Sequence, residues 1–200
     1  MWTPALGRFR RSKTMKKFAA LFLSCLMTAS VFTACGDSDG GGSNSSKHEK
    51  IVEKWADAAI TPKGAEDYFT CTFPDEYIDT LKNEGVWDNM VQDYNDDIQA
   101  DLDDGYSYKI DEVKMSGELT EDELKSAENF FFRINDTETT VKAGFWYDVK
   151  ATRTKDGDDD TQAQEVAAVE LENDGWKVIP FDHDSLSYYS DNSSEDTSKD

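Results

Sequence analysis

The chain opens with a basic stretch that leads into an apolar run. Residues 18–34 read FAALFLSCLMTASVFTA, and the preceding segment carries Arg8, Arg10, Arg11, Lys13, Lys16 and Lys17 without any acid. A basic head, a short apolar core and small residues at its end predict a secretory signal peptide over residues 1–34. A membrane-spanning helix is the weaker interpretation, because a span needs about 20 strongly apolar residues. MKKF at Met15 looks like the usual start of such a signal, so we expect the true start there.

Several segments after residue 46 have the apolar spacing of amphipathic helices. The clearest lies between Trp87 and Leu102, where apolar residues recur every three or four positions and aspartates occupy the other face. Earlier helices are predicted to begin near His48, Pro62 and Pro74. The letters LTEDEL form a capping box from Thr120 to Glu123, which predicts a further helix that runs to about Phe132.

Alternating apolar residues indicate strands in the second half of the chain. They occur at 106–115, 141–151, 166–171 and 176–181, separated by turns at 155–158 and 173–175. The parity of the first of these runs changes near Asp111, which predicts a β-bulge. We therefore expect an α+β domain over residues 47–184, with N-terminal helices packed on a curved antiparallel sheet of about four strands. The Ser/Asp-rich residues 185–200 are predicted to form a disordered acidic tail, although Tyr188 and Tyr189 are candidates for local docking.

Charge and cysteine content narrow the classes of function. Loss of the six early cations would leave 15 of the 21 Lys and Arg against all 42 Asp and Glu, a net charge of −27. Such a chain repels nucleic acid and anionic membrane surfaces, so we expect neither as a partner. Cys71 would be the lone cysteine of the folded part, so no disulfide framework is expected and a packed core must supply the stability.

Cys35 follows the apolar run directly. The segment FTAC at residues 32–35 resembles the lipobox of bacterial lipoproteins, although Phe32 stands where an aliphatic residue is usual. In that family the cysteine thiol receives a diacylglyceryl group and becomes the first residue after cleavage. The resemblance implies a lipidated Cys35, a flexible Gly/Ser linker over 35–46, and a location on the outer face of the cytoplasmic membrane. An ordinary signal peptide with a chance cysteine is the alternative.

The order of elements and the closing segment DGWKVIPF at 174–181 resemble the nuclear-transport-factor-type, or cystatin-like, cone fold. More narrowly, the chain looks like small secreted lipoproteins of Gram-positive bacteria that carry such a domain. The resemblance implies a curved sheet wrapped against helices, often with a pocket at the wide end. That fold is shared by isomerases, dehydratases and non-catalytic binding or assembly domains, so it does not choose a function.

Motifs for catalysis or metal binding are incomplete. HEKIV at 48–52 has Val52 where a zinc protease needs its second histidine, and His183 is the only other histidine. Asp156, Asp158 and Asp160 have calcium-loop spacing, but the later glycine and bidentate glutamate are missing, which favours a solvated hairpin tip. The acidic residues near 101–104 are expected to be a solvated surface, and Cys71 a small buried hydrophobe. We expect no cofactor and no metal.

Four aromatic residues are candidates to line a cone pocket: Tyr106, Tyr108, Phe145 and Tyr147. Core packing is the favoured interpretation for them, because aromatic residues on a strand face are ordinarily core. The preferred functional hypothesis is a lipid-anchored, non-catalytic module that binds a small ligand or another envelope protein. The alternative is a small enzyme of isomerase or hydrolase type that uses a carboxylate or tyrosine in an apolar pocket, and a protease-inhibitor module is a third idea. A carboxylate or histidine that points into an enclosed pocket with a shifted pKa would favour the enzyme.

Overall fold

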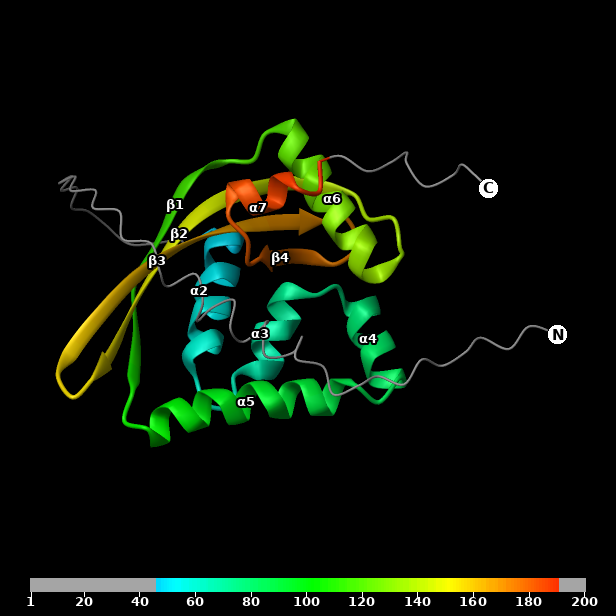
Figure 1. The fold of residues 1–200 in the computed structure, drawn as a ribbon. Helices are drawn as coiled ribbons and strands as arrows, with labels where there is room; N and C mark the ends of the chain where they lie inside the picture. Colours follow the sequence, from blue (N-terminus) through cyan, green and yellow to red (C-terminus); the bar gives the residue numbers. More distant parts are fainter. Residues whose placement is uncertain (1–45, 191–200) are drawn as a thin grey trace, which may run out of the picture. The chain divides into compact units, whose positions relative to one another are not determined.

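The computed structural model describes residues 46–190, in which helices come first and a sheet follows (Figure 1). The first helices are α2 (Lys47–Ile60), α3 (Ala65–Thr72), α4 (Asp75–Asn83) and α5 (Trp87–Asp103). The remaining elements are β1 (Ser107–Glu118), α6 (Glu121–Asn135), β2 (Val141–Lys155), β3 (Asp158–Leu171), β4 (Gly175–Ile179) and α7 (His183–Ser187). The predicted α+β class, with helices before a four-stranded antiparallel sheet, is confirmed.

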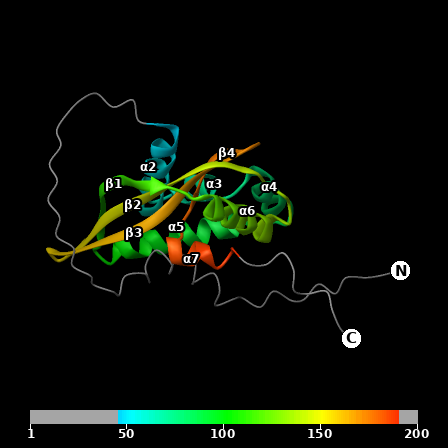
Figure 2. The same ribbon diagram turned by 90° about the horizontal axis from the view of Figure 1, so that it is seen from above.

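The strands lie in the order β1-β2-β3-β4, and each neighbouring pair is antiparallel. The register of β1 shifts between Ile110 and Glu112, where the change of parity predicted a bulge, and shifts again between Met115 and Gly117. The tight β2–β3 turn uses two positive φ angles, 55° at Asp156 and 87° at Gly157. The hairpin end of β2 and β3 lies on the side away from α4 and α6 (Figures 1 and 2).

Helices cover both faces of the sheet. α2 crosses one face and contacts all four strands, whereas α6 and α7 lie on the other (Figure 2). The α2 side is closed by buried residues that include Val52 and Trp55. The α6 side contains an apolar cluster of side chains from the sheet and from both helices, among them Phe131, Trp146 and Leu186. The core therefore has two layers, separated by the sheet.

Aromatic rings pack α3 between α2 and α5. The Tyr68 ring on α3 stacks on Trp55 of α2 at 5.6 Å and on Tyr94 of α5 at 4.9 Å between ring centroids. The Tyr94 hydroxyl donates a hydrogen bond to the Ala59 carbonyl at 3.1 Å, which fixes α5 against the end of α2. The helices thus form a layer with an aromatic core of its own.

A buried lysine joins the helical layer to β4. The Lys177 side chain is 4% exposed, and its ammonium contacts the Thr70 carbonyl at 3.1 Å, Asp75 Oδ1 at 3.1 Å and Asp174 Oδ2 at 3.3 Å. Thr70 belongs to the last turn of α3, where carbonyls lack helical partners. Asp174 Oδ2 also accepts the Asp75 backbone N–H at 2.9 Å, so the start of α4 is held to the turn before β4.

The folded part extends past the boundary predicted after Asp184. Residues 183–187 form α7, which is capped by Asp182 through the Ser185 backbone N–H at 2.8 Å. The Leu186 side chain is fully buried, and the Tyr189 ring packs edge-on against Phe130. The predicted disorder from Ser185 therefore does not hold for residues 185–190, because Leu186 and Tyr189 pack against the α6 side of the core. Residues 191–200 lie outside the described residues.

Candidate functional site

The four aromatic residues predicted to line one pocket separate into two places. Tyr106 and Tyr108 lie near the hairpin end. The Tyr106 ring is covered by Arg153 and Lys155 at 4.7 and 4.2 Å from its centroid, and the Tyr108 hydroxyl donates to Asp101 at 2.5 Å. Phe145 and Tyr147 lie nearer the start of β2, away from the hairpin end. These four residues are therefore not brought around one common cavity.

Phe145 and Tyr147 meet two residues outside the predicted pocket lining, His48 and Trp176. His48 belongs to the first turn of α2, and Trp176 belongs to β4. The His48 ring stacks on Phe145 at 4.1 Å and lies 5.2 Å from Trp176 and 6.0 Å from Tyr147. We call these four residues the aromatic cluster. His48, Phe145 and Trp176 are half-buried, whereas Tyr147 is buried.

Hydrogen bonds fix the histidine in the aromatic cluster. His48 Nδ1 lies 2.5 Å from the Tyr147 hydroxyl and 3.1 Å from Ser46 Oγ. Burial lowers the pKa of His48, although the nearby Glu49 carboxylate opposes this effect. Burial raises the pKa of Tyr147. The geometry fits a neutral imidazole whose Nδ1 accepts the hydrogen bond that the phenol donates.

Carboxylates surround the aromatic cluster. Glu118 is the cross-strand partner of Phe145, and Glu170 is that of Trp176, so each side chain shares a face with its ring. The charges of Glu49 and Glu53, on α2, contribute to the raised pKa of Tyr147. Within residues 46–190 none of these four carboxylates forms an ion pair. We call Glu49, Glu53, Glu118 and Glu170 the acidic rim.

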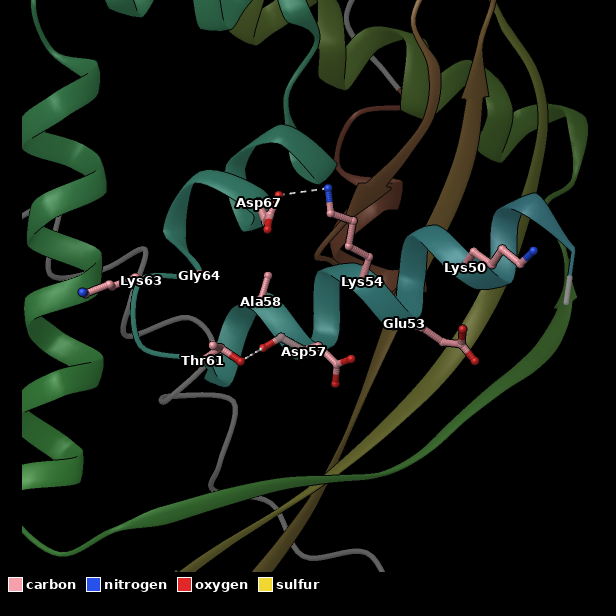
Figure 3. Close-up of a pocket in the computed structure, with 9 residues that line it drawn as sticks. All are labelled: Lys50, Glu53, Lys54, Asp57, Ala58, Thr61, Lys63, Gly64 and Asp67. Atoms are coloured by element: carbon pink, nitrogen blue, oxygen red, sulfur yellow. Dashed lines mark hydrogen bonds and ion pairs between the residues drawn. The ribbon is translucent and has the colours of Figure 1, made fainter.

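A groove lies between α2 and the start of α3, and it shares Glu53 with the acidic rim (Figure 3). Its volume is about 490 Å³, and its lining is mostly charged: Lys50, Glu53, Lys54, Asp57, Ala58, Thr61, Lys63, Gly64 and Asp67. Lys54 pairs with Asp67 at 2.9 Å. The three lysines point in different directions and do not converge on one centre (Figure 3). None of the four predicted pocket residues lines this groove.

The second histidine is oriented by a carboxylate. His183 Nδ1 lies 2.5 Å from Glu123 Oε1, and the same oxygen accepts the Trp146 indole N–H at 3.2 Å. Glu123 Oε2 accepts the backbone N–H and the hydroxyl of Thr120, at 2.6 and 2.8 Å. Burial raises the pKa of Glu123, but these hydrogen bonds and the His183 charge outweigh it, so the pKa is lowered overall. The His183 side chain is 61% exposed, which leaves most of its ring in water.

The remaining candidate residues occupy ordinary structural settings. Cys71 is buried and free, and burial raises the pKa of its thiol, which disfavours the nucleophilic thiolate. At the hairpin end, Thr154 donates to Asp159 at 2.6 Å and Gln162 donates to Asp160 at 2.8 Å. Across residues 46–190 no group of three His, Cys, Asp or Glu side chains is arranged to hold a metal ion. No helix in this part of the chain is long and apolar enough to cross a membrane.

Comparisons with known proteins do not add a family to this description. No protein-family model, no curated protein and no solved structure matches the chain. The molecule is therefore characterised by its fold and by its aromatic cluster: an acidic α+β domain in which a neutral histidine is held among aromatic rings.

Proposed function

We propose that the chain is an exported lipoprotein, anchored through Cys35 to the outer face of the cytoplasmic membrane. Cys35, the signal over 1–34 and most of the linker over 35–46 lie outside the described residues, so the support is the sequence. A basic head, an apolar run, the lipobox-like FTAC and a Gly/Ser-rich segment follow one another in the order an anchored protein requires. The folded domain would then stand off the membrane on its linker.

The domain itself acts, in this proposal, as a non-catalytic binding or assembly module. The observation that carries it is the aromatic cluster, which presents three half-buried rings beside carboxylates that form no ion pair within residues 46–190. Its histidine is engaged through Nδ1 with Tyr147 and Ser46. Rings with a polar fringe are a common composition of binding surfaces. The order of helices before a four-stranded antiparallel sheet also supports the resemblance to the cystatin-like, or nuclear-transport-factor-type, cone.

The anchor is tested with Cys35→Ala. Cells that express the wild type or the variant are fed radioactive palmitate, and the protein in membranes and medium is measured. The wild type is expected to be labelled and membrane-bound, and the variant unlabelled and released. An unlabelled wild type, or equal membrane retention of both proteins, would contradict the anchor.

The binding role is tested separately by photo-crosslinking in intact cells from position 176, with Tyr106 as the matched control position. Discrete adducts from position 176 and not from 106 are expected. Identical adduct patterns from the two positions would contradict a binding surface at the aromatic cluster.

An enzymatic candidate of another kind than the predicted carboxylate or tyrosine in an apolar pocket rests on the His183–Glu123 pair. A mostly buried carboxylate that holds one nitrogen of an exposed imidazole resembles the way a base is oriented in hydrolases. Under this alternative, His183→Gln would abolish hydrolysis of activated esters by the purified chain, and His48→Gln would not. Equal rates for the wild type and both variants would exclude the alternative.

A further inference from the structure

Lysine and arginine side chains lie over aromatic rings at several places in this domain. Arg153 and Lys155 cover Tyr106, Arg133 covers Tyr189, and Lys82 covers Trp87, with cation-to-centroid distances from 4.2 to 5.3 Å. Such contacts contribute because the face of an aromatic ring carries negative potential. Within residues 46–190 no cation lies over Phe145 or Trp176. These two rings lie 5.9 Å apart and belong to the aromatic cluster.

The surroundings of the aromatic cluster favour a cation more strongly than an apolar ligand. Two carboxylates of the acidic rim, Glu118 and Glu170, lie directly across the strands from these rings. Their charges are not neutralised by any ion pair in the described part of the chain. The chain after residue 34 carries a net charge of −27, so the long-range field also attracts cations. His48, held neutral by burial, adds no opposing charge at neutral pH.

We propose that the aromatic cluster and its acidic rim form the docking surface for a basic segment of another protein, whose Lys or Arg side chains lie against Trp176 and Phe145. This inference rests on the proposed binding function and names its partner class. The aromatic rings supply the short-range contact, and Glu49, Glu53, Glu118 and Glu170 supply charge complementarity around it. A partner of this kind associates rapidly and dissociates as salt is raised.

The test uses the full-length chain with Cys35→Ala and a fluorescein-labelled peptide of alternating Ser and Lys. A peptide of alternating Ser and Glu is the charge control. Binding is followed by fluorescence anisotropy at low and at physiological salt. The Lys peptide is expected to bind and to weaken with salt, and the Glu peptide is expected not to bind.

Two kinds of variant locate the site. Trp176→Leu keeps an apolar side chain but removes the ring, and is expected to weaken binding by roughly 2- to 30-fold. Tyr106→Leu, whose ring is already covered by cations, is the matched control and is expected to leave binding unchanged. Glu118→Gln with Glu170→Gln is expected to weaken binding at least about twofold more than Asp88→Asn with Asp93→Asn, which changes net charge equally on α5.

The inference would be overturned by equal binding of the two peptides, by an unaffected Trp176→Leu variant, or by equal losses from the two pairs of carboxylate substitutions. The last would mean that only overall charge attracts the peptide. Tight binding that needs removal of the residues before Ser46 would assign the aromatic cluster to that segment of the chain instead. None of these results bears on palmitate labelling of the wild type, so the proposed anchor stands or falls separately.

Discussion

Lys177→Met removes one positive charge from the junction of α3, α4 and β4 while keeping most of the side chain's apolar volume. The lysine stem is buried with only 4% of the side chain exposed, and methionine fills a similar space. What is lost is the ammonium and its three oxygen contacts. The substitution therefore separates the electrostatic contribution of Lys177 from its packing.

The three contacts contribute unequally. Asp75 is 74% exposed, so its pairing with Lys177 contributes only about 0–1 kcal/mol. Asp174 is 16% exposed and would lose the ammonium that favours its carboxylate form. The Thr70 carbonyl would lose a part-buried hydrogen bond at the end of α3, and such a loss costs up to about 1–3 kcal/mol where water cannot replace the donor. We expect Lys177→Met to lower the free energy of unfolding by about 2–4 kcal/mol.

Replacing Asp174, which accepts from the Lys177 ammonium, is expected to affect stability less than replacing Lys177. Burial raises its pKa, even though the ammonium 3.3 Å away favours the carboxylate, so desolvation outweighs the ion pair. A carboxyl with a raised pKa in the folded state costs stability at neutral pH, and that cost disappears as pH falls through this pKa. Asp174→Asn keeps an acceptor for the Asp75 N–H, so it is expected to destabilise less than Lys177→Met.

Urea unfolding at pH 7, followed by tryptophan fluorescence, measures these differences. The expected order of stability is wild type, then Asp75→Ala close below it, then Lys177→Met clearly lowest. If Lys177→Met unfolds within about 0.5 kcal/mol of the wild type, the ammonium contributes no net stability and the reasoning fails. If Asp75→Ala lowers the free energy of unfolding as much as Lys177→Met does, the exposed Lys177–Asp75 ion pair contributes more than about 1 kcal/mol.

Three further substitutions test other parts of the fold by the same unfolding assay. Glu123→Gln removes a carboxylate whose pKa is lowered below 4.5, so the wild type's advantage over the variant should be full above about pH 5 and shrink as pH falls through that lowered pKa. The pKa of His48 is lowered below 6.5, so the wild type should lose stability as pH falls below 6.5, and His48→Gln should not share that loss. Parallel curves of stability against pH for the two proteins would argue against a buried neutral ring. Gly144→Ala places a methyl group 2.8 Å from a Leu119 methyl, so it should cost about 1–3 kcal/mol, and a neutral result would show that the Leu119 side chain can shift to make room.

Local signals in the sequence predicted local structure well. The capping box between Thr120 and Glu123 is present in both directions, and the bulge near Asp111 is where the parity of β1 changes. The last strand ends at Ile179, short of the predicted Phe181, because Pro180 has no N–H to continue the ladder. These features depend on residues close in sequence, which is why pattern and capping rules predict them.

The aromatic cluster could not be predicted in this way. His48 and Tyr147 are 99 positions apart, and their contact depends on how α2 crosses the sheet. The parity of β2 places Phe145 and Tyr147 on one face, but it does not say which helix residue meets them. In the sequence, His48 belongs only to an incomplete zinc motif. In the structure, its ring stacks on Phe145.

The burial of Leu186 has a consequence for the order in which the domain can be completed. The Leu186 side chain closes the α6 side of the core, yet it follows every strand and every other helix in the described chain. In a protein that leaves the cell N-terminus first, the sheet and α6 would emerge before the residue that covers them. The apolar face would stay open until almost all of the chain had crossed the membrane, and during that interval it would be exposed to chaperones and to other unfinished chains.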